Sequence, residues 1–118
     1  MNWEGGMSLG EIIQELKKHD KSKHLNIGLY KPGSYRGYYE CLMFEPKHNS
    51  TVGESLKSCQ EANGKTYTGY KGGEYIMTTD TECYFAEYGA TGVAITKPIL
   101  HGILNNFYEF DDFIIMFY

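Results

Sequence analysis

Arg36 is the only arginine of this 118-residue chain, and it lies between tyrosines in the segment SYRGYY that begins at Ser34. A guanidinium group can donate two parallel hydrogen bonds to a phosphate or a carboxylate, and it can also stack on an aromatic ring. These residue types therefore indicate a site for an anionic ligand. On the alternative interpretation, Arg36 is a solvated strand residue whose aliphatic stem covers a tyrosine ring.

A second segment, GYKGGEY, again combines tyrosine, glycine and a cation. Tyrosine rings can stack on a nucleotide base, lysine can bind its phosphates, and glycine lets the backbone approach closely. The segment lacks P-loop spacing and no helix is expected after it, so a generic turn is the alternative interpretation. The predicted ligand-binding residues are Tyr35, Arg36, Gly37, Tyr38, Tyr70, Lys71, Gly72, Gly73, Tyr75 and Lys31.

No combination of residues in the sequence indicates catalysis, a metal site or a cofactor. The cysteines have no histidine neighbour, and on strand faces Cys41 and Cys83 are expected to act as small buried apolar residues. The four histidines lack the spacing of metal ligands. Four glutamates occur in matched pairs that could bind a cation or transfer protons, although a solvated face is the commoner role. They are Glu40, Glu45, Glu82 and Glu87.

Length and composition indicate one domain that covers residues 1–118. The formal net charge of −4 argues against binding to duplex nucleic acid, which requires a basic surface. Three cysteines without CxxC spacing and the lack of a signal-peptide pattern predict a cytoplasmic protein with reduced thiols. No apolar run reaches the ~18 residues that a membrane helix needs, so we expect no membrane partner.

The two halves of the chain share short motifs in the same order. SLGE, YKPGSY and EC in the first half match TVGE, YKGGEY and EC in the second half, at offsets of 40 to 43 residues. We interpret this as an internal duplication with units at about 8–46 and 51–92, followed by a C-terminal extension at 93–118. Chance similarity is the alternative interpretation.

Each unit is predicted to be a helix followed by a hairpin-like pair of strands. SLGE and TVGE are capping boxes, in which a hydroxyl and the glutamate three residues later bind the first free amides of a helix. They predict helices near residues 9–19 and 52–62. The tyrosine-rich segments that follow are typical of strands, with turns at YKPGSY and YKGGEY. We therefore predict an α+β fold in which the helices pack on one face of a sheet.

The alternation of side chains along the strands predicts which residues share a face. In YYECLMF, Leu42 and Phe44 lie on one face and Cys41 lies on the other. In the matched segment ECYFAEY, one face carries Cys83 and Phe85. Because both faces are partly apolar, we expect helices to cover one side of the sheet and other groups to occupy part of the second side.

The C-terminal extension is predicted to hold one more strand and one more helix. VAIT at 93–96 is typical of a strand, and Pro98 can open a helix that ends at Asn105 and Asn106. The apolar terminus FIIMFY at 113–118 needs a partner surface, either inside the sheet or at a subunit interface. We therefore expect a homo-oligomer.

The motifs SYRGYY, TVGE, GYKGGEY and AEYGATG, in that order, resemble a group of small bacteriophage and prophage proteins. The resemblance covers residues 34–46 and 51–92, and the group has no settled activity. It implies a viral protein that acts against host defence in the host cytoplasm. One implied mode is sequestration of a nucleotide-derived signal of the cyclic nucleotide or ADP-ribose type. The alternative is an inhibitor that binds a host defence protein through its tyrosine-rich surface.

Overall fold

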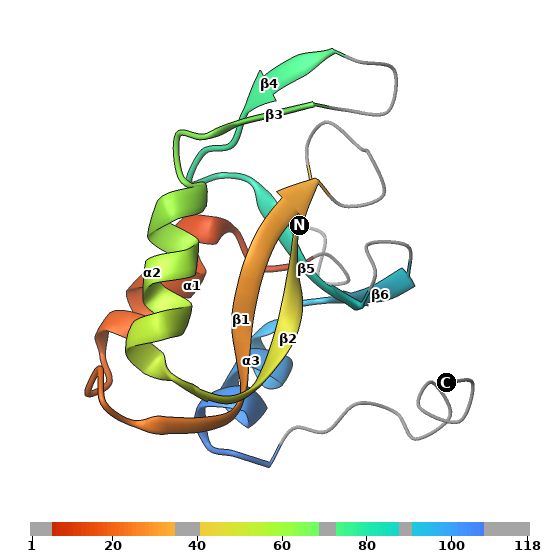
Figure 1. Cartoon of the computed structure of the whole chain (residues 1–118). Coiled ribbons are helices and arrows are strands. Elements are labelled where there is room, and N and C mark those ends of the chain that lie inside the picture. The colour runs from red at the N-terminus through yellow and green to blue at the C-terminus, as the bar shows by residue number, and fades with distance from the viewer. Residues whose placement is uncertain (1–5, 35–40, 69–72, 88–90, 108–118) are drawn as a thin grey trace.

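The computed structural model describes residues 6–34, 41–68, 73–87 and 91–107, and Figure 1 shows the chain with its elements labelled. In these residues, three helices and six strands form an α+β protein, as predicted. Their order along the chain is α1 (Leu9–Lys17), β1 (His24–Ser34), β2 (Cys41–Thr51), α2 (Val52–Ala62), β3 (Thr66–Thr68), β4 (Glu74–Ile76), β5 (Glu82–Glu87), β6 (Thr91–Ala94) and α3 (Lys97–Leu104).

Four of the strands form one mixed sheet in the order β1-β2-β5-β6. The pairs β1–β2 and β5–β6 are antiparallel, whereas β2 and β5 run parallel. A parallel pair needs a long crossover connection, and α2 with the strands β3 and β4 lies between β2 and β5 in the chain. β3 and β4 form a separate antiparallel hairpin that projects from one end of the molecule (Figure 1).

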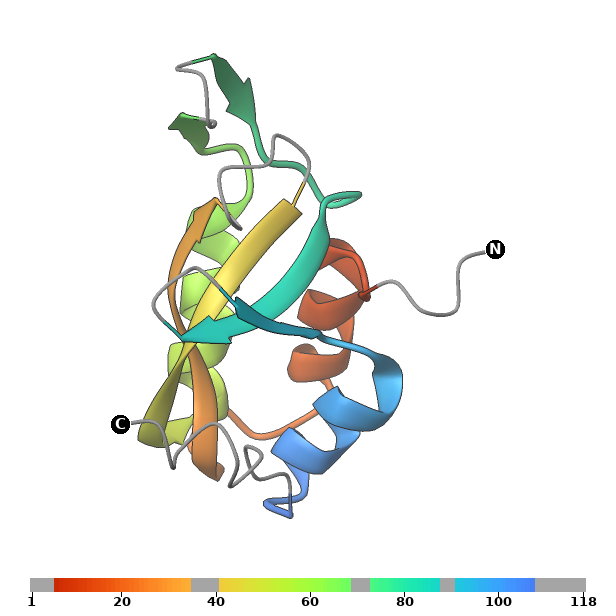
Figure 2. The same ribbon diagram turned by 90° about the vertical axis from the view of Figure 1, so that its right-hand side faces the viewer.

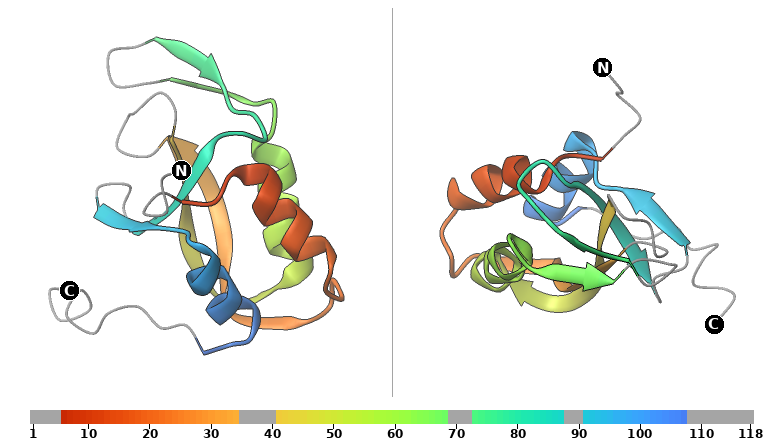
Figure 3. Two further views of the ribbon diagram at one scale, coloured as in Figure 1. Left: turned by 180° about the vertical axis from the view of Figure 1, so that it is seen from behind. Right: turned by 90° about the horizontal axis from the view of Figure 1, so that it is seen from above.

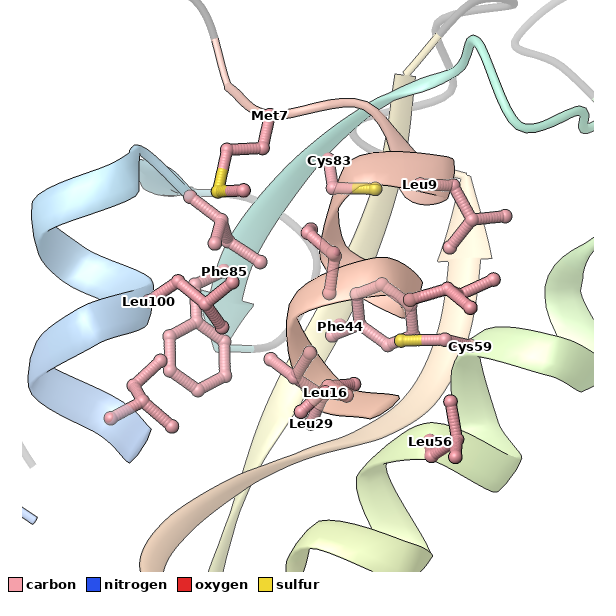
Figure 4. Packing of buried hydrophobic residues seen from close by; sticks show 14 of the residues in the cluster. Met7, Leu9, Leu16, Leu29, Phe44, Leu56, Cys59, Cys83, Phe85 and Leu100 are labelled. Atoms are coloured by element: carbon pink, nitrogen blue, oxygen red, sulfur yellow. The ribbon is translucent and has the colours of Figure 1, made fainter. Parts of the chain in front are cut away.

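The helices pack against one face of the main sheet. Leu42 and Phe44 on β2, and Cys83 and Phe85 on β5, are fully buried, while Cys41 on the other face of β2 is only half-buried. Figure 4 shows that side chains from all three helices and from the strands meet in this core. Figure 2 looks onto the second face, where β2 and β5 lie in front of α2 and no helix of the described chain covers them. The predicted division of the two strand faces is therefore confirmed.

Both predicted capping boxes are present. At α1 the Glu11 amide donates to Ser8 Oγ (3.2 Å), and the Ser8 amide donates to Glu11 Oε1 (2.9 Å). At α2 the reciprocal hydrogen bonds between Thr51 and Glu54 are both 3.1 Å long. α1 ends at Lys17, slightly before the predicted end, and α2 ends where predicted.

α2 lies close to β1 at Gly28. A Cβ atom at this position would lie 2.5 Å from Ser50 Oγ and 2.8 Å from Ser55 Oγ, so no larger residue fits without a shift. The buried Ser55 Oγ accepts a hydrogen bond from the Leu29 amide (2.9 Å). This contact fixes α2 against β1 just before Tyr30.

The predicted turn at YKPGSY is wrong. Residues 30–34 continue β1 through a bulge, at which the register with β2 shifts between Tyr30 and Gly33. Pro32 has no amide hydrogen for the ladder, and Lys31 has a left-handed backbone with φ 52°. A bulge accommodates both features, because the extra residue does not need to pair across the strands. YKGGEY, in contrast, lies mainly between the end of β3 at Thr68 and the start of β4.

The two halves are not arranged alike in the sheet. In the first half, the strand pair that follows the helix joins the main sheet, whereas in the second half β3 and β4 form their own sheet. The matched segment ECYFAE is β5, the third strand after its helix, and it pairs directly with β2. The internal duplication therefore stays a prediction from the sequence.

The C-terminal extension contains the expected strand and helix. β6 overlaps VAIT, and α3 begins at Lys97 with Pro98 in its first turn. After α3, Asn106 takes a left-handed backbone, and its side chain accepts from the Asn26 amide (2.8 Å) and donates to the His24 carbonyl (3.0 Å). These two hydrogen bonds attach the end of α3 to β1. The apolar terminus at 113–118 lies outside the described residues.

Candidate functional site

Most of the predicted ligand-binding residues lie outside the described residues. These are Tyr35, Arg36, Gly37 and Tyr38 in the first segment, and Tyr70, Lys71 and Gly72 in the second. Of the remaining three, Lys31 lies in β1, Gly73 directly precedes β4, and the backbone of Tyr75 pairs with Tyr67 of β3.

The described flanks of the two segments lie at the same end of the molecule. Ser34 ends β1 and Cys41 begins β2, while Thr68 ends β3 and Gly73 precedes β4. The β3–β4 hairpin stands at the end of the main sheet where β1 finishes, in the front view and in the view from behind (Figure 1, Figure 3). Contacts between β1 and β3 agree with this placement. The fold thus brings together the strand ends that flank the two tyrosine and glycine segments.

The bulge in β1 determines how Lys31 is presented. Its left-handed backbone is uncommon for a residue with a side chain and costs on the order of 1–3 kcal/mol, which the surrounding pairing must offset. The side chain is 70% exposed, and its Nζ lies 4.0 Å from Oε2 of the 31% exposed Glu45 on β2. An ion pair of this length and exposure is weak, so the ammonium group can exchange its partner for a ligand.

Tyr30, Lys31, Glu45 and Lys47 form a surface cluster on the β1–β2 hairpin, hereafter the hairpin cluster. Tyr30 is opposite Glu45 in the ladder and exposes 48% of its surface. Lys47 Nζ lies 5.4 Å from the centre of the Tyr30 ring, within the range of a cation–π contact. The same Nζ lies 3.1 Å from Glu54 Oε2 at the start of α2. The cluster thus combines an aromatic face with two cations.

Sequence reasoning predicted Lys31 but missed Tyr30 and Lys47 as its neighbours. Lys47 lies outside the tyrosine-rich motifs, and it reaches Tyr30 only because β1 and β2 pair in this register. Pairing the two strand segments with Tyr30 opposite Glu45 would have revealed this contact. Glu45 and Lys47 are two residues apart on one strand, so both side chains lie on the same face as Tyr30.

Glu82 and Tyr84 of β5 and Cys41 of β2 form a second group, on the uncovered face of the sheet. The Tyr84 hydroxyl donates to Glu82 Oε1 (2.8 Å), and Cys41 Sγ lies 4.0 Å from the same oxygen. Reactive thiols need positively charged surroundings, so a neighbouring carboxylate does not activate Cys41 as a nucleophile. Of the other matched glutamates, Glu40 and the side chain of Glu87 lie outside the described part of the chain.

Cys59 and Cys83 are core residues. Both are fully buried, and burial raises the pKa of each thiol well above its ordinary value. The prediction of a buried apolar role is confirmed for Cys83. It is wrong for Cys41, which is half-exposed because it lies on the face of β2 opposite to the core.

A groove of about 530 Å³ lies between the end of α1 and α3, hereafter the α1–α3 groove. Its lining includes Glu15 and His19 from α1 and its C-terminal turn, and Lys97 and His101 from α3. The two helices lie next to each other in Figures 2 and 3. Sequence reasoning found no metal-ligand spacing among the histidines, and no local signal predicts that His19 and His101 share a groove.

Within the described ranges, no group of three or more histidine, cysteine or acidic side chains could hold a metal ion. None of the helices in these ranges is long and apolar enough to cross a membrane. Comparison with protein-family models, with curated proteins and with solved structures found no match. The site must therefore be interpreted from its own geometry.

Proposed function

We propose that this protein binds a small anionic, nucleotide-like ligand and does not convert it chemically. The proposed site is the end of the β1–β2 hairpin, where Lys31 and Lys47 provide charge and Tyr30 provides an aromatic face. The predicted residues of the segments 35–38 and 70–75 complete it. The carrying observation is the bulge at Lys31, where a strained left-handed backbone presents an exposed ammonium group beside Glu45, the residue opposite Tyr30 in the ladder.

The energies of such contacts are sufficient for binding without catalysis. A base stacked on an aromatic ring contributes about 1–3 kcal/mol, and a charge-assisted hydrogen bond about 1.5–3 kcal/mol. One stacking contact and two charged hydrogen bonds sum to about 4–9 kcal/mol, which corresponds to millimolar to micromolar affinity before the cost of association is subtracted. The weak pairing of Lys31 with Glu45 leaves its charge available for this purpose.

The biological role that we propose follows from the resemblance to small phage proteins. In this role the protein is made in an infected bacterium and sequesters a nucleotide-derived signal of host defence, such as a cyclic nucleotide or an ADP-ribose derivative. A sequestering protein needs affinity and abundance but no turnover. The hairpin cluster agrees with this role, because it combines exposed cations with an aromatic ring and has no nucleophile among its described members.

Isothermal titration calorimetry with 3′,5′-cyclic AMP and ADP-ribose tests the proposal. We expect Lys31→Gln and Arg36→Ala each to weaken binding about tenfold, the equivalent of ~1.4 kcal/mol. Lys57→Gln is the matched control, because Lys57 is an exposed lysine on α2 that belongs to neither the hairpin cluster nor the α1–α3 groove. Equal affinity in wild type and Lys31→Gln, or no binding of either ligand, rejects the proposed site.

A second candidate function is inhibition of a host defence protein by direct contact. The observation that favours it is the β3–β4 hairpin, which stands apart from the main sheet and leaves Ile76 60% exposed. Exposed apolar residues on a projecting element are common at protein interfaces. Co-purification from infected cells, followed by reconstitution with the purified partner, distinguishes the two functions. Ile76→Asp must abolish this complex, and Lys31→Gln must leave it intact.

A further inference from the structure

We propose that the α1–α3 groove is a second binding site, separate from the hairpin cluster, for a small organic monocarboxylate with an apolar body. The groove combines an apolar floor with a charged rim. Leu100 and Leu104 of α3 form the floor, each only 2% exposed and packed into the core. Its volume of about 530 Å³ lies in the usual range for small-molecule sites.

The rim carries both signs of charge. Lys97 contributes an ammonium group, and imidazoles come from His101 of α3 and from His19 just after the end of α1. The opposing charge is Glu15, whose carboxylate accepts a hydrogen bond from Lys18 Nζ (2.8 Å). This hydrogen bond lowers the pKa of Glu15, and the positive charges of Lys18, Lys97 and His19 lower it further. Glu15 is therefore ionised and already paired, which leaves Lys97 for a ligand.

The charge distribution selects a monocarboxylate from among the anions. A phosphate monoester carries nearly two negative charges at neutral pH. Its second charge would find no further lysine or arginine among the described lining residues, and it would add to the repulsion from Glu15. The leucine floor adds the apolar contact that a free inorganic anion cannot use. In the proposed complex, the carboxylate of the ligand lies at Lys97 and His101, and its apolar body lies on Leu100 and Leu104. Both parts of the ligand must therefore contribute to binding.

His101 is held in position by its neighbours. The Phe107 ring packs edge-on against the imidazole, with centroids 6.3 Å apart. The side-chain amide of Asn105 donates to the His101 carbonyl (2.8 Å), which secures the end of α3. Asn106 attaches the same end to β1 through its hydrogen bonds with Asn26 and His24. A ligand thus meets a rim that is already ordered, which lowers the entropic cost of binding.

Amide NMR titration with hexanoate as the probe tests this proposal, with acetate for the head group alone and 1-hexanol for the body alone. Hexanoate is expected to shift the resonances of His19, Leu100 and His101, with a Kd on the order of 1 mM. Acetate and 1-hexanol should each bind about tenfold more weakly. Equal binding of hexanoate and 1-hexanol, or shifts confined to the hairpin cluster, overturns the proposal.

Two variants with opposite effects sharpen the test. Lys97→Gln removes a favourable charge and should weaken hexanoate binding about fivefold. Glu15→Gln removes the opposing charge, frees Lys18 and should strengthen binding about threefold. Lys57→Gln should leave the affinity unchanged. A purely structural role predicts no such opposite response, so changes in the same direction, or no change, refute the site. The nucleotide titration of Lys31→Gln is independent, so the two proposals can fail separately.

Discussion

Cys41 of β2 lies directly opposite Glu82 of β5 in the parallel pair. The sequence similarity aligns Cys41 with Cys83, but the ladder pairs Leu42 with Cys83 instead. Because neighbouring residues on paired strands share a face, this one-residue difference sends Cys41 to the uncovered face and Cys83 to the core. Two cysteines in similar motifs thus have different surroundings.

The first prediction concerns the reactivity of these thiols. In the native protein, Cys41 should react with a thiol reagent such as Ellman's reagent, while Cys59 and Cys83 should react only after unfolding. Burial protects the latter two from the reagent, and their raised pKa values keep them protonated. Cys41→Ser should therefore remove the fast phase. Equal reaction of all three thiols in native conditions would contradict the core arrangement.

The second prediction compares two neighbours on β2. Phe44 is fully buried between the sheet and the helices, so Phe44→Ala should lower the free energy of unfolding by ~3–5 kcal/mol. Met43 lies on the uncovered face and is half-buried, and Met43→Ala should cost about 1 kcal/mol. Urea denaturation measures both. A larger loss for Met43→Ala would mean that the sheet faces are exchanged.

The third prediction concerns the bulge at Lys31. Lys31 has φ 52°, in the left-handed region of the backbone, where a β-branched side chain is strained. Lys31→Val should therefore lower the free energy of unfolding by ~1–2 kcal/mol. Lys31→Gly should keep or raise the stability by up to ~1 kcal/mol. Thermal unfolding of both variants provides the measurement. If Val is tolerated better than Gly at this position, the backbone is extended rather than left-handed.

The fourth prediction concerns Glu54 and pH. Hydrogen bonds from Lys47 and Ser50 lower the pKa of Glu54 from its ordinary value of 4.5, and the Thr51 amide adds to the effect. The folded state therefore favours the ionised carboxylate, and its stabilising effect is complete above pH 4.5 and is lost as the pH falls through the folded pKa.

Urea midpoints at about pH 6 and pH 3 measure this dependence. The drop between the two should be smaller in Glu54→Gln than in wild type. Glu61→Gln on the same helix is the matched control, because Glu61 is exposed and belongs to no ion pair that we describe. An identical pH dependence in wild type and Glu54→Gln would show that the interactions of Glu54 do not contribute to stability.

The fifth prediction concerns self-association, which was inferred from the sequence. Deletion of residues 113–118 removes the apolar segment FIIMFY. If this segment forms a subunit interface, analytical ultracentrifugation should show a smaller species for the deleted chain than for the full chain. If it pairs inside a single chain, deletion should instead lower the solubility. An unchanged, soluble monomer would contradict both roles.

Local patterns in the sequence were sufficient to predict where α1 and α2 begin, which residues of β2 share a face, and the fold class. The capping boxes at Ser8 and Thr51 depend on residues three positions apart, and the alternation in β2 depends on residues two apart. Such interactions form within one helix or strand, so their sequence patterns can be recognised without knowledge of the rest of the chain.

The tertiary structure decided the features that depend on distant residues. The register of β1 with β2 brings Lys47 to Tyr30 and converts the expected turn at YKPGSY into a bulged strand. The packing of α1 beside α3 places His19 and His101, from opposite parts of the chain, in one groove. These arrangements arise from the burial of a shared core and from strand pairing. Both are properties of the whole chain, and no short stretch of sequence specifies them.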